Sequence, residues 1–137
     1  MNAIDSAPNT VGQAWIEIIK RPSQDEFALA FTQEAALDAS VASAPIVGTV
    51  AIRAFFTATR GMYDQIEFVH ETRSNSRTYL EWQGRFQGRE VAGTTILAYD
   101  AQGLIESIRL YHRPYAQVIA FAAELARRLS GNTDAAR

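Results

Sequence analysis

The chain has 137 residues, 47% of them hydrophobic, a length and composition that suit one compact domain with a single core. Its 15 acidic and 13 basic residues give a formal net charge of -2, which excludes a broad basic surface for phosphates, so nucleic acid is not an expected partner. The absence of cysteine excludes disulfides, thiolate nucleophiles and cysteine-ligated zinc.

The amino-terminal residues lack a cationic segment followed by an apolar run, and no apolar stretch approaches the roughly 20 residues that span a bilayer. We therefore expect a cytoplasmic protein with no membrane partner. The composition indicates one domain at residues 9–130, with flexible tails at 1–8 and 131–137.

Two helices are predicted before the first strand. The first covers residues 9–20, with Trp15 on its apolar stripe. The second covers residues 23–30, where Ser23 and Glu26 form a capping-box pattern.

The next segment predicts a short strand and then a third helix. Leu37 and Val41 suit a short strand followed by an irregular crossing. Thr49 is the expected cap of a helix that runs to Arg60, and Gly61 supplies a permissive stop. The apolar positions of this helix recur at helical spacing at Ile52, Phe55 and Phe56.

From Gln65 the hydrophobic period changes to two, which predicts four strands joined by short turns. The strands are approximately Gln65–Arg73, Arg77–Phe86, Glu90–Tyr99 and Leu104–Arg113. The turns are expected at Ser74–Ser76, Gln87–Gly88 and Asp100–Gly103. Because the connections are short, we expect antiparallel pairing between consecutive strands.

A last helix is expected to begin at Pro114 and to end near Gly131, with Val118 and Leu125 on its apolar stripe. Three helices followed by a curved antiparallel sheet form an α+β arrangement in which the helices cover one face of the sheet.

In this order the elements resemble the nuclear transport factor 2-like superfamily, whose members fold a bent sheet into a cone open at one end. The stretch from Trp15 to Phe56 resembles the ketosteroid isomerase branch without a gap, on residues that include Glu17, Phe31, Glu34, Pro45, Gly48 and Ile52. The stretch from Gly88 to Pro114 is similar to the SnoaL-like branch. The resemblance implies a cystatin-like α+β barrel with a carboxy-terminal helix, a hydrophobic pocket and no cofactor.

The isomerase's acids are not present at the matching positions. Its general-base aspartate falls on Ala39, its oxyanion-binding tyrosine on Trp15 and its protonated aspartate on Thr95. The ketosteroid reaction by the familial mechanism is therefore not expected. Trp15 can still donate to a carbonyl oxygen, and Thr95 can donate one hydrogen bond, although packing explains Trp15 equally well.

His112 is the candidate catalytic residue, because the resemblance places it where the isomerase has a pocket-facing aromatic. A neutral imidazole in such a cavity can act as base or acid near pH 7. The alternative is a histidine that only fills the pocket mouth. Phe55 and Ile108 are expected to line the cavity with Trp15 and Thr95.

His70 shares its strand face with Ile66 and Phe68, so it is expected to point toward apolar surroundings, either in the pocket or, as the favoured alternative, in the core. A metal site that combines the histidines with Glu106 is not supported, because no close-spaced pair of ligands is present.

Three further features leave alternatives open. Tyr63, just beyond the third helix, lies either at the mouth of the cone or over the helix end. The strand Arg77–Phe86 presents a polar face and an apolar face, and Glu81 becomes a second base candidate only if the polar face lines the cavity. Arg109 and Tyr111 lie on the strand face away from His112 and suit a homodimer contact through the sheet.

Two functions follow from these residues. The first is a cofactor-independent isomerase, cyclase or hydratase acting on a mostly apolar small molecule. The second is a module that binds a hydrophobic molecule or a partner protein without catalysis, which the missing acids favour.

Overall fold

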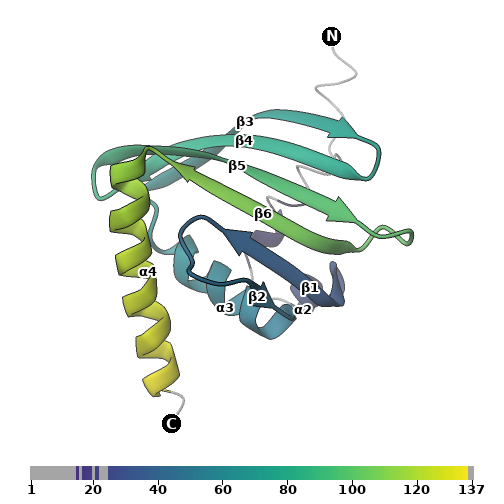
Figure 1. The fold of residues 1–137 in the computed structure, drawn as a ribbon, viewed down its shortest axis with the longest axis horizontal. Coiled ribbons are helices and arrows are strands. Elements are labelled where there is room, and N and C mark those ends of the chain that lie inside the picture. The colour runs from purple at the N-terminus through teal and green to yellow at the C-terminus, as the bar shows by residue number, and fades with distance from the viewer. Residues whose placement is uncertain (1–14, 16, 20, 22–24, 136–137) are drawn as a thin grey trace.

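A curved, open six-stranded sheet with helices against one face forms the fold in our computed structural model (Figure 1). The structure describes residues 15, 17–19, 21 and 25–135. Within the first predicted helix, Trp15 and residues 17–19 are helical, and its remaining residues, the predicted tail at 1–8 and the Ser23 cap lie outside the described residues. The predicted cone-like α+β class is confirmed.

The strands appear in the sheet in the order β2-β1-β6-β5-β4-β3. Their bounds are Phe31–Ala39 for β1, Ile46–Val47 for β2, Gln65–Ser74 for β3, Arg77–Phe86 for β4, Arg89–Tyr99 for β5 and Ile105–Arg113 for β6. The four predicted strands β3 to β6 form the expected antiparallel meander.

The first strand differs from the prediction. It has nine residues and pairs in parallel with β6, with Leu37 opposite Ile108, so the sheet is mixed and not purely antiparallel. A register shift between Phe31 and Ala36 disturbs its alternation. The partner strand lies far along the sequence, and therefore no local pattern reveals this pairing.

Besides the helical residues at 15 and 17–19, the described part of the chain contains the helices α2 at Asp25–Leu29, α3 at Thr49–Arg60 and α4 at Tyr115–Ala135. In Figure 1, α2 and α3 lie under the sheet near β1, and α4 descends from one end of it. The last helix continues past Gly131, where the sequence predicts its end. No helix among the described residues is long and apolar enough to cross a membrane.

The predicted cap of α3 at Thr49 is wrong, because Thr49 is already helical and Gly48 is the cap. Gly48 has a φ of 94°, a conformation that favours glycine, and its carbonyl accepts from the Ile52 N–H at 3.0 Å. The Gln87–Gly88 turn is confirmed, with φ values of 53° and 78° that join β4 and β5.

Alternation in β4 decides which face of the strand lines the interior. Leu80, Trp82 and Phe86 are buried, whereas Glu81 is exposed. Glu81 is therefore not a base candidate in the cavity.

Candidate functional site

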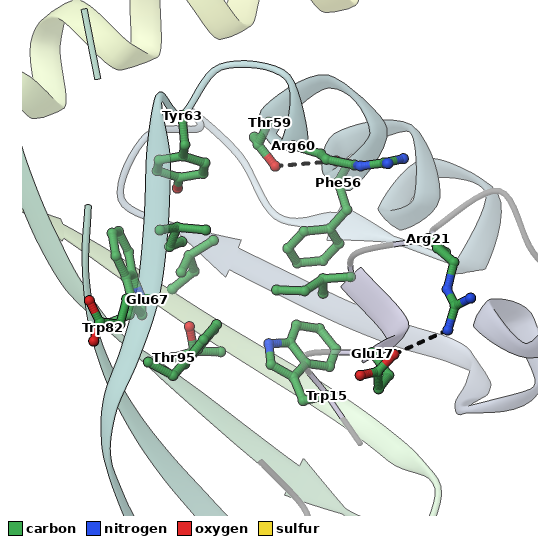
Figure 2. A pocket seen from close by; sticks show the side chains of 14 residues that line it. Trp15, Glu17, Arg21, Phe56, Thr59, Arg60, Tyr63, Glu67, Trp82 and Thr95 are labelled. Atoms are coloured by element: carbon green, nitrogen blue, oxygen red, sulfur yellow. Dashed lines mark hydrogen bonds and ion pairs between the residues drawn. The ribbon is translucent and has the colours of Figure 1, made fainter. Parts of the chain in front are cut away.

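A cavity of about 740 Å³ lies between the helical residues around Trp15, the end of α3 and the concave side of β3 to β6 (Figure 2). Most of its wall is apolar and rich in aromatic rings. The aromatic residues are Trp15, Phe56, Tyr63, Phe68 and Trp82. Such a wall suits a mostly apolar small molecule.

The charged residues of the cavity wall are exposed and therefore form its rim. They are Glu17, Arg21, Arg60 and Glu67. Arg21 donates to Glu17 at 3.1 Å in an ion pair that is about half exposed. The interior thus contains no described ionised side chain, and its polar groups are hydroxyl and indole N–H groups.

Three neighbouring residues on β4, β5 and β6 form one row across the sheet: Trp82, Gly93 and His112. A Cβ atom at Gly93 would overlap the ring of Trp82 and the backbone oxygen of Tyr111. Glycine at this position therefore lets the indole lie across β5, where its ring centroid is 4.9 Å from that of His112.

Tyr63 and His112 form the polar contact next to the cavity. The Tyr63 hydroxyl oxygen lies 2.7 Å from Nε2 of His112. Phe121 from α4 covers the imidazole with a ring centroid distance of 4.7 Å, and the backbone N–H of His112 donates to Oγ of Ser40 at 2.9 Å. The contacts with Tyr63 and Phe121 fix the ring, and the bond to Ser40 fixes the backbone of His112.

Burial determines the charge of both partners. It lowers the pKa of His112 to about 4, so the imidazole is neutral at pH 7. It also raises the pKa of Tyr63, so the phenol keeps its hydrogen. Nδ1 of His112 is buried and has no hydrogen-bond partner within the described part of the chain. The contact is therefore one hydrogen bond between two neutral groups.

The structure brings only part of the predicted site together. Trp15 and Thr95 line the cavity. His112 is 7% exposed and lies behind Tyr63 and Trp82, so it is not part of the cavity wall. Tyr63, for which the sequence allowed two interpretations, lies in the cavity wall. The sequence indicated this place only through the position of Tyr63 just beyond the third helix.

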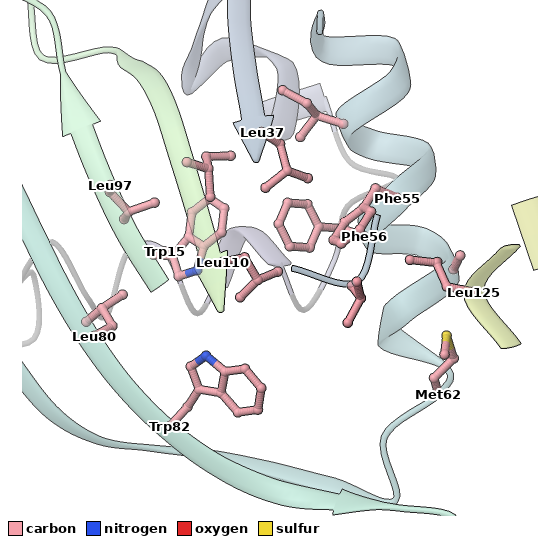
Figure 3. Packing of buried hydrophobic residues seen from close by; sticks show 14 of the residues in the cluster. Trp15, Leu37, Phe55, Phe56, Met62, Leu80, Trp82, Leu97, Leu110 and Leu125 are labelled. Carbon is pink, nitrogen blue, oxygen red and sulfur yellow. The ribbon is translucent and has the colours of Figure 1, made fainter. Parts of the chain in front are cut away.

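Phe55 and Ile108 lie in the filled core and not in the cavity wall, and each is 0% exposed. Figure 3 shows Phe55 on α3 and Trp82 on β4 among the buried side chains of one hydrophobic cluster. The alternation that predicted Ile108 as inward-facing is right, but the inward space at that point is occupied by the core.

His70 is exposed, and the expectation that it points toward apolar surroundings is wrong. The register between β3 and β4 shifts between Phe68 and His70, so the alternation from Ile66 and Phe68 does not continue. Its Nε2 lies 3.1 Å from Oγ1 of Thr72. Among the described residues, no group of three or more histidine, aspartate or glutamate side chains is placed to hold a metal ion.

Comparisons with known proteins give likeness in structure only. No family model and no curated protein matches the chain. A steroid delta-isomerase from Pseudomonas aeruginosa superposes with a TM-score of 0.79 at 20% identity, covering 88% of this chain and 90% of that one.

Two further structures agree. A bacterial protein with a cystatin-like fold from Silicibacter pomeroyi gives a TM-score of 0.72 at 13% identity, over 85% of this chain and 79% of that one. A putative polyketide cyclase from Sinorhizobium meliloti gives 0.63 at 18% identity, over 80% and 99%. At these identities the likeness concerns the fold, and it confirms the resemblance seen in the sequence: the chain has the nuclear transport factor 2-like fold.

Proposed function

We propose that this protein is a cofactor-independent enzyme of the isomerase, cyclase or hydratase type that acts on a mostly apolar small molecule in the cavity. The observation that supports it best is the cavity-lining Tyr63 hydroxyl, 2.7 Å from Nε2 of His112. The steroid delta-isomerase and the putative polyketide cyclase share the fold and favour the same class of reaction.

The chemistry at this end of the cavity is hydrogen bonding to a substrate oxygen. The proton that leaves the neighbouring carbon passes to solvent, and the Tyr63 hydroxyl stabilises the enolate oxygen that forms. A hydroxyl held in an apolar wall stabilises charge that develops on a substrate oxygen more strongly than water does. Because His112 lies behind Tyr63, it acts on the substrate through the Tyr63 hydroxyl. Trp15 and Thr95 hold an oxygen atom of the substrate from other parts of the wall.

Proton exchange in heavy water tests this proposal. The probe is 4-androstene-3,17-dione, an apolar ketone, and deuterium uptake at the carbons next to its carbonyls is followed by mass spectrometry. We expect uptake that His112→Ala lowers by about 10², because the Tyr63 hydroxyl is then no longer held against the substrate oxygen. The exposed His70→Ala is the matched control and should retain wild-type uptake. Equal uptake in wild type and His112→Ala would contradict the role of His112.

A non-catalytic ligand-binding function is the second candidate. Two observations favour it: the isomerase's acids are replaced by Ala39 and Thr95, and burial of His112 lowers its pKa, which makes the imidazole a weak base. A ketone that binds the wild-type protein without any deuterium uptake would support this function and contradict the enzymatic one.

We also propose a homodimer through the outer face of the sheet. On that face Tyr111 of β6 is 46% exposed and pairs with Thr94 of β5. Thr94 pairs in turn with the exposed Glu81 of β4, so the three residues form one row across the sheet. Light scattering should give twice the monomer mass, and Tyr111→Glu should lower it. A monomeric wild type would contradict the proposal. The cytoplasmic location stays a prediction from the sequence.

A further inference from the structure

The two ring nitrogens of His112 have different surroundings. Nε2 lies 2.7 Å from the Tyr63 oxygen, whereas Nδ1 is buried without a partner in the described part of the chain. A neutral imidazole has one hydrogen, which sits on one of these nitrogens and leaves the other as an acceptor. The position of this hydrogen decides which way the Tyr63 hydroxyl points its own.

A hydrogen on Nδ1 would leave a buried N–H without a partner, and such groups are rare in folded proteins. A hydrogen on Nε2 is donated to the Tyr63 oxygen, and only a lone pair at Nδ1 is left unpaired. In that arrangement the Tyr63 hydrogen is not used by His112. Because Tyr63 lines the cavity and its hydroxyl points inward (Figure 2), that hydrogen is available to whatever the cavity binds.

We infer that Tyr63 donates its hydroxyl hydrogen to a carbonyl oxygen of the bound molecule, while the Nε2–H of His112 holds the phenol oxygen in place. This inference rests on the proposed function only in that the cavity is the ligand site. Tyr63 is then the residue that touches the substrate, and His112 is a positioning residue.

The rest of the cavity interior fits a neutral carbonyl compound. Trp15 can only donate through its indole N–H, and Thr95 has a hydroxyl that can also donate. In Figure 2 the indole nitrogen of Trp15 is directed toward the part of the cavity that Thr95 lines, and the Tyr63 hydroxyl points inward from the opposite end. Donors without a buried cation favour an uncharged acceptor oxygen, since a carboxylate would lose its hydration without an opposite charge.

The position of the hydrogen can be measured without any ligand or activity. The probe is the full chain labelled with ¹⁵N-histidine, whose ring nitrogens are assigned by NMR at pH 7. We expect Nε2 of His112 to bear the hydrogen and Nδ1 to be bare. The reverse assignment, with the hydrogen on Nδ1, would overturn the inference whatever the protein catalyses.

A pair of matched probes tests the ligand contact. 2-Acetylnaphthalene and 2-ethylnaphthalene have the same carbon skeleton and differ in one carbonyl oxygen. Tyr63→Phe should weaken binding of the ketone about 3- to 10-fold and leave binding of the hydrocarbon unchanged. Tyr111→Phe makes the same chemical change on the outer face of β6 and should change neither.

Other outcomes of the probe experiment separate this inference from the proposed function. Equal weakening of both probes by Tyr63→Phe would assign Tyr63 a packing role only and overturn the inference. Ketone binding that Tyr63→Phe leaves unchanged would overturn it as well. If neither probe binds the wild-type protein, the cavity is not the ligand site and the proposed function fails together with the ligand contact, while the NMR assignment still decides the hydrogen position.

Two substitutions of His112 separate positioning from proton transfer. The amide of His112→Gln can place an N–H near the former Nε2, whereas His112→Leu cannot. We expect the Gln variant to keep the preference for the ketone within about threefold of wild type and the Leu variant to lose it. Loss of the preference in both variants, with the fold intact by circular dichroism, would overturn the positioning role.

Discussion

The two halves of the concave side use the same kinds of residue for different purposes. Under β1 and around Ile108 of β6 the space is filled, and Leu37, Ile52, Phe55 and Ile108 are each 0% exposed. Beside β3 and β4 the wall is equally apolar, yet it encloses the cavity. The difference comes from the placement of the helices, since α3 packs mainly on β1 and β2. Hydrophobicity alone therefore does not distinguish a core from a binding cavity.

The largest expected effect is in the filled half. Phe55→Ala should lower the free energy of unfolding by about 3 to 5 kcal/mol, because it removes a fully buried ring and leaves a cavity that the neighbours only partly close. Urea unfolding followed by circular dichroism measures the change. Val50→Ala, at an 85% exposed position of the same helix, is the control and should change stability by less than about 0.5 kcal/mol.

The cavity half offers the direct counterpart. Ile66 lines the cavity and is 40% exposed, so Ile66→Ala should cost no more than about 1 kcal/mol. A loss for Ile66→Ala as large as that for Phe55→Ala would remove the distinction between the two halves.

The next effect concerns His112, which lies at the boundary between core and cavity. Its pKa is about 4 in the folded protein and about 6.5 in an unfolded chain. The unfolded state therefore binds more protons as the pH falls from about 6.5 to about 4, and the folded state loses stability over that range. With about 1.4 kcal/mol for each pKa unit, the loss amounts to about 3 kcal/mol.

Urea unfolding of wild type and His112→Gln between pH 7 and pH 4 checks this sign and size. The Gln variant should lack the part of the acid-induced loss that belongs to His112, so its stability should fall less steeply. His70→Gln, at an exposed position, should follow the wild-type profile. Parallel profiles for wild type and His112→Gln would mean that the imidazole is not buried as the structure shows.

The predictability of each element depended on how local its determinants are. Every strand end of the predicted meander from Gln65 to Arg113 agrees with the structure to within one residue, because alternation and turn residues lie next to one another in the sequence. The strand Phe31–Ala39 was recognised only in part, since its parallel partner β6 is distant in sequence and a register shift obscures its alternation.

The site was less predictable than the fold. Trp15 and Thr95 were found through the family resemblance, but the contact between Tyr63 and His112 joins residues 49 positions apart. The sequence could not distinguish Phe55, which points into the filled half, from its neighbour Phe56, which lines the cavity. One step along α3 changes the direction of a side chain by about 100°, and only packing decides which direction meets open space.

The smallest expected effect on stability is at Thr95, which lies between the filled core and the cavity. This residue is 2% exposed and lines the cavity, and no partner for its hydroxyl is found in the described ranges. Thr95→Val replaces the hydroxyl by a methyl group of similar size, so the free energy of unfolding should change by less than about 1 kcal/mol, because no hydrogen bond is lost. Thr94→Val on the other face of β5 controls for the effect of valine on the strand.

Binding should respond more than stability: the hydrocarbon 2-ethylnaphthalene should bind at least as tightly as to wild type, since an unpaired hydroxyl no longer has to be desolvated. A decrease of more than about 2 kcal/mol in the free energy of unfolding of Thr95→Val would show that the Thr95 hydroxyl stabilises the core. Thr95 would then belong to the core and not to the cavity wall.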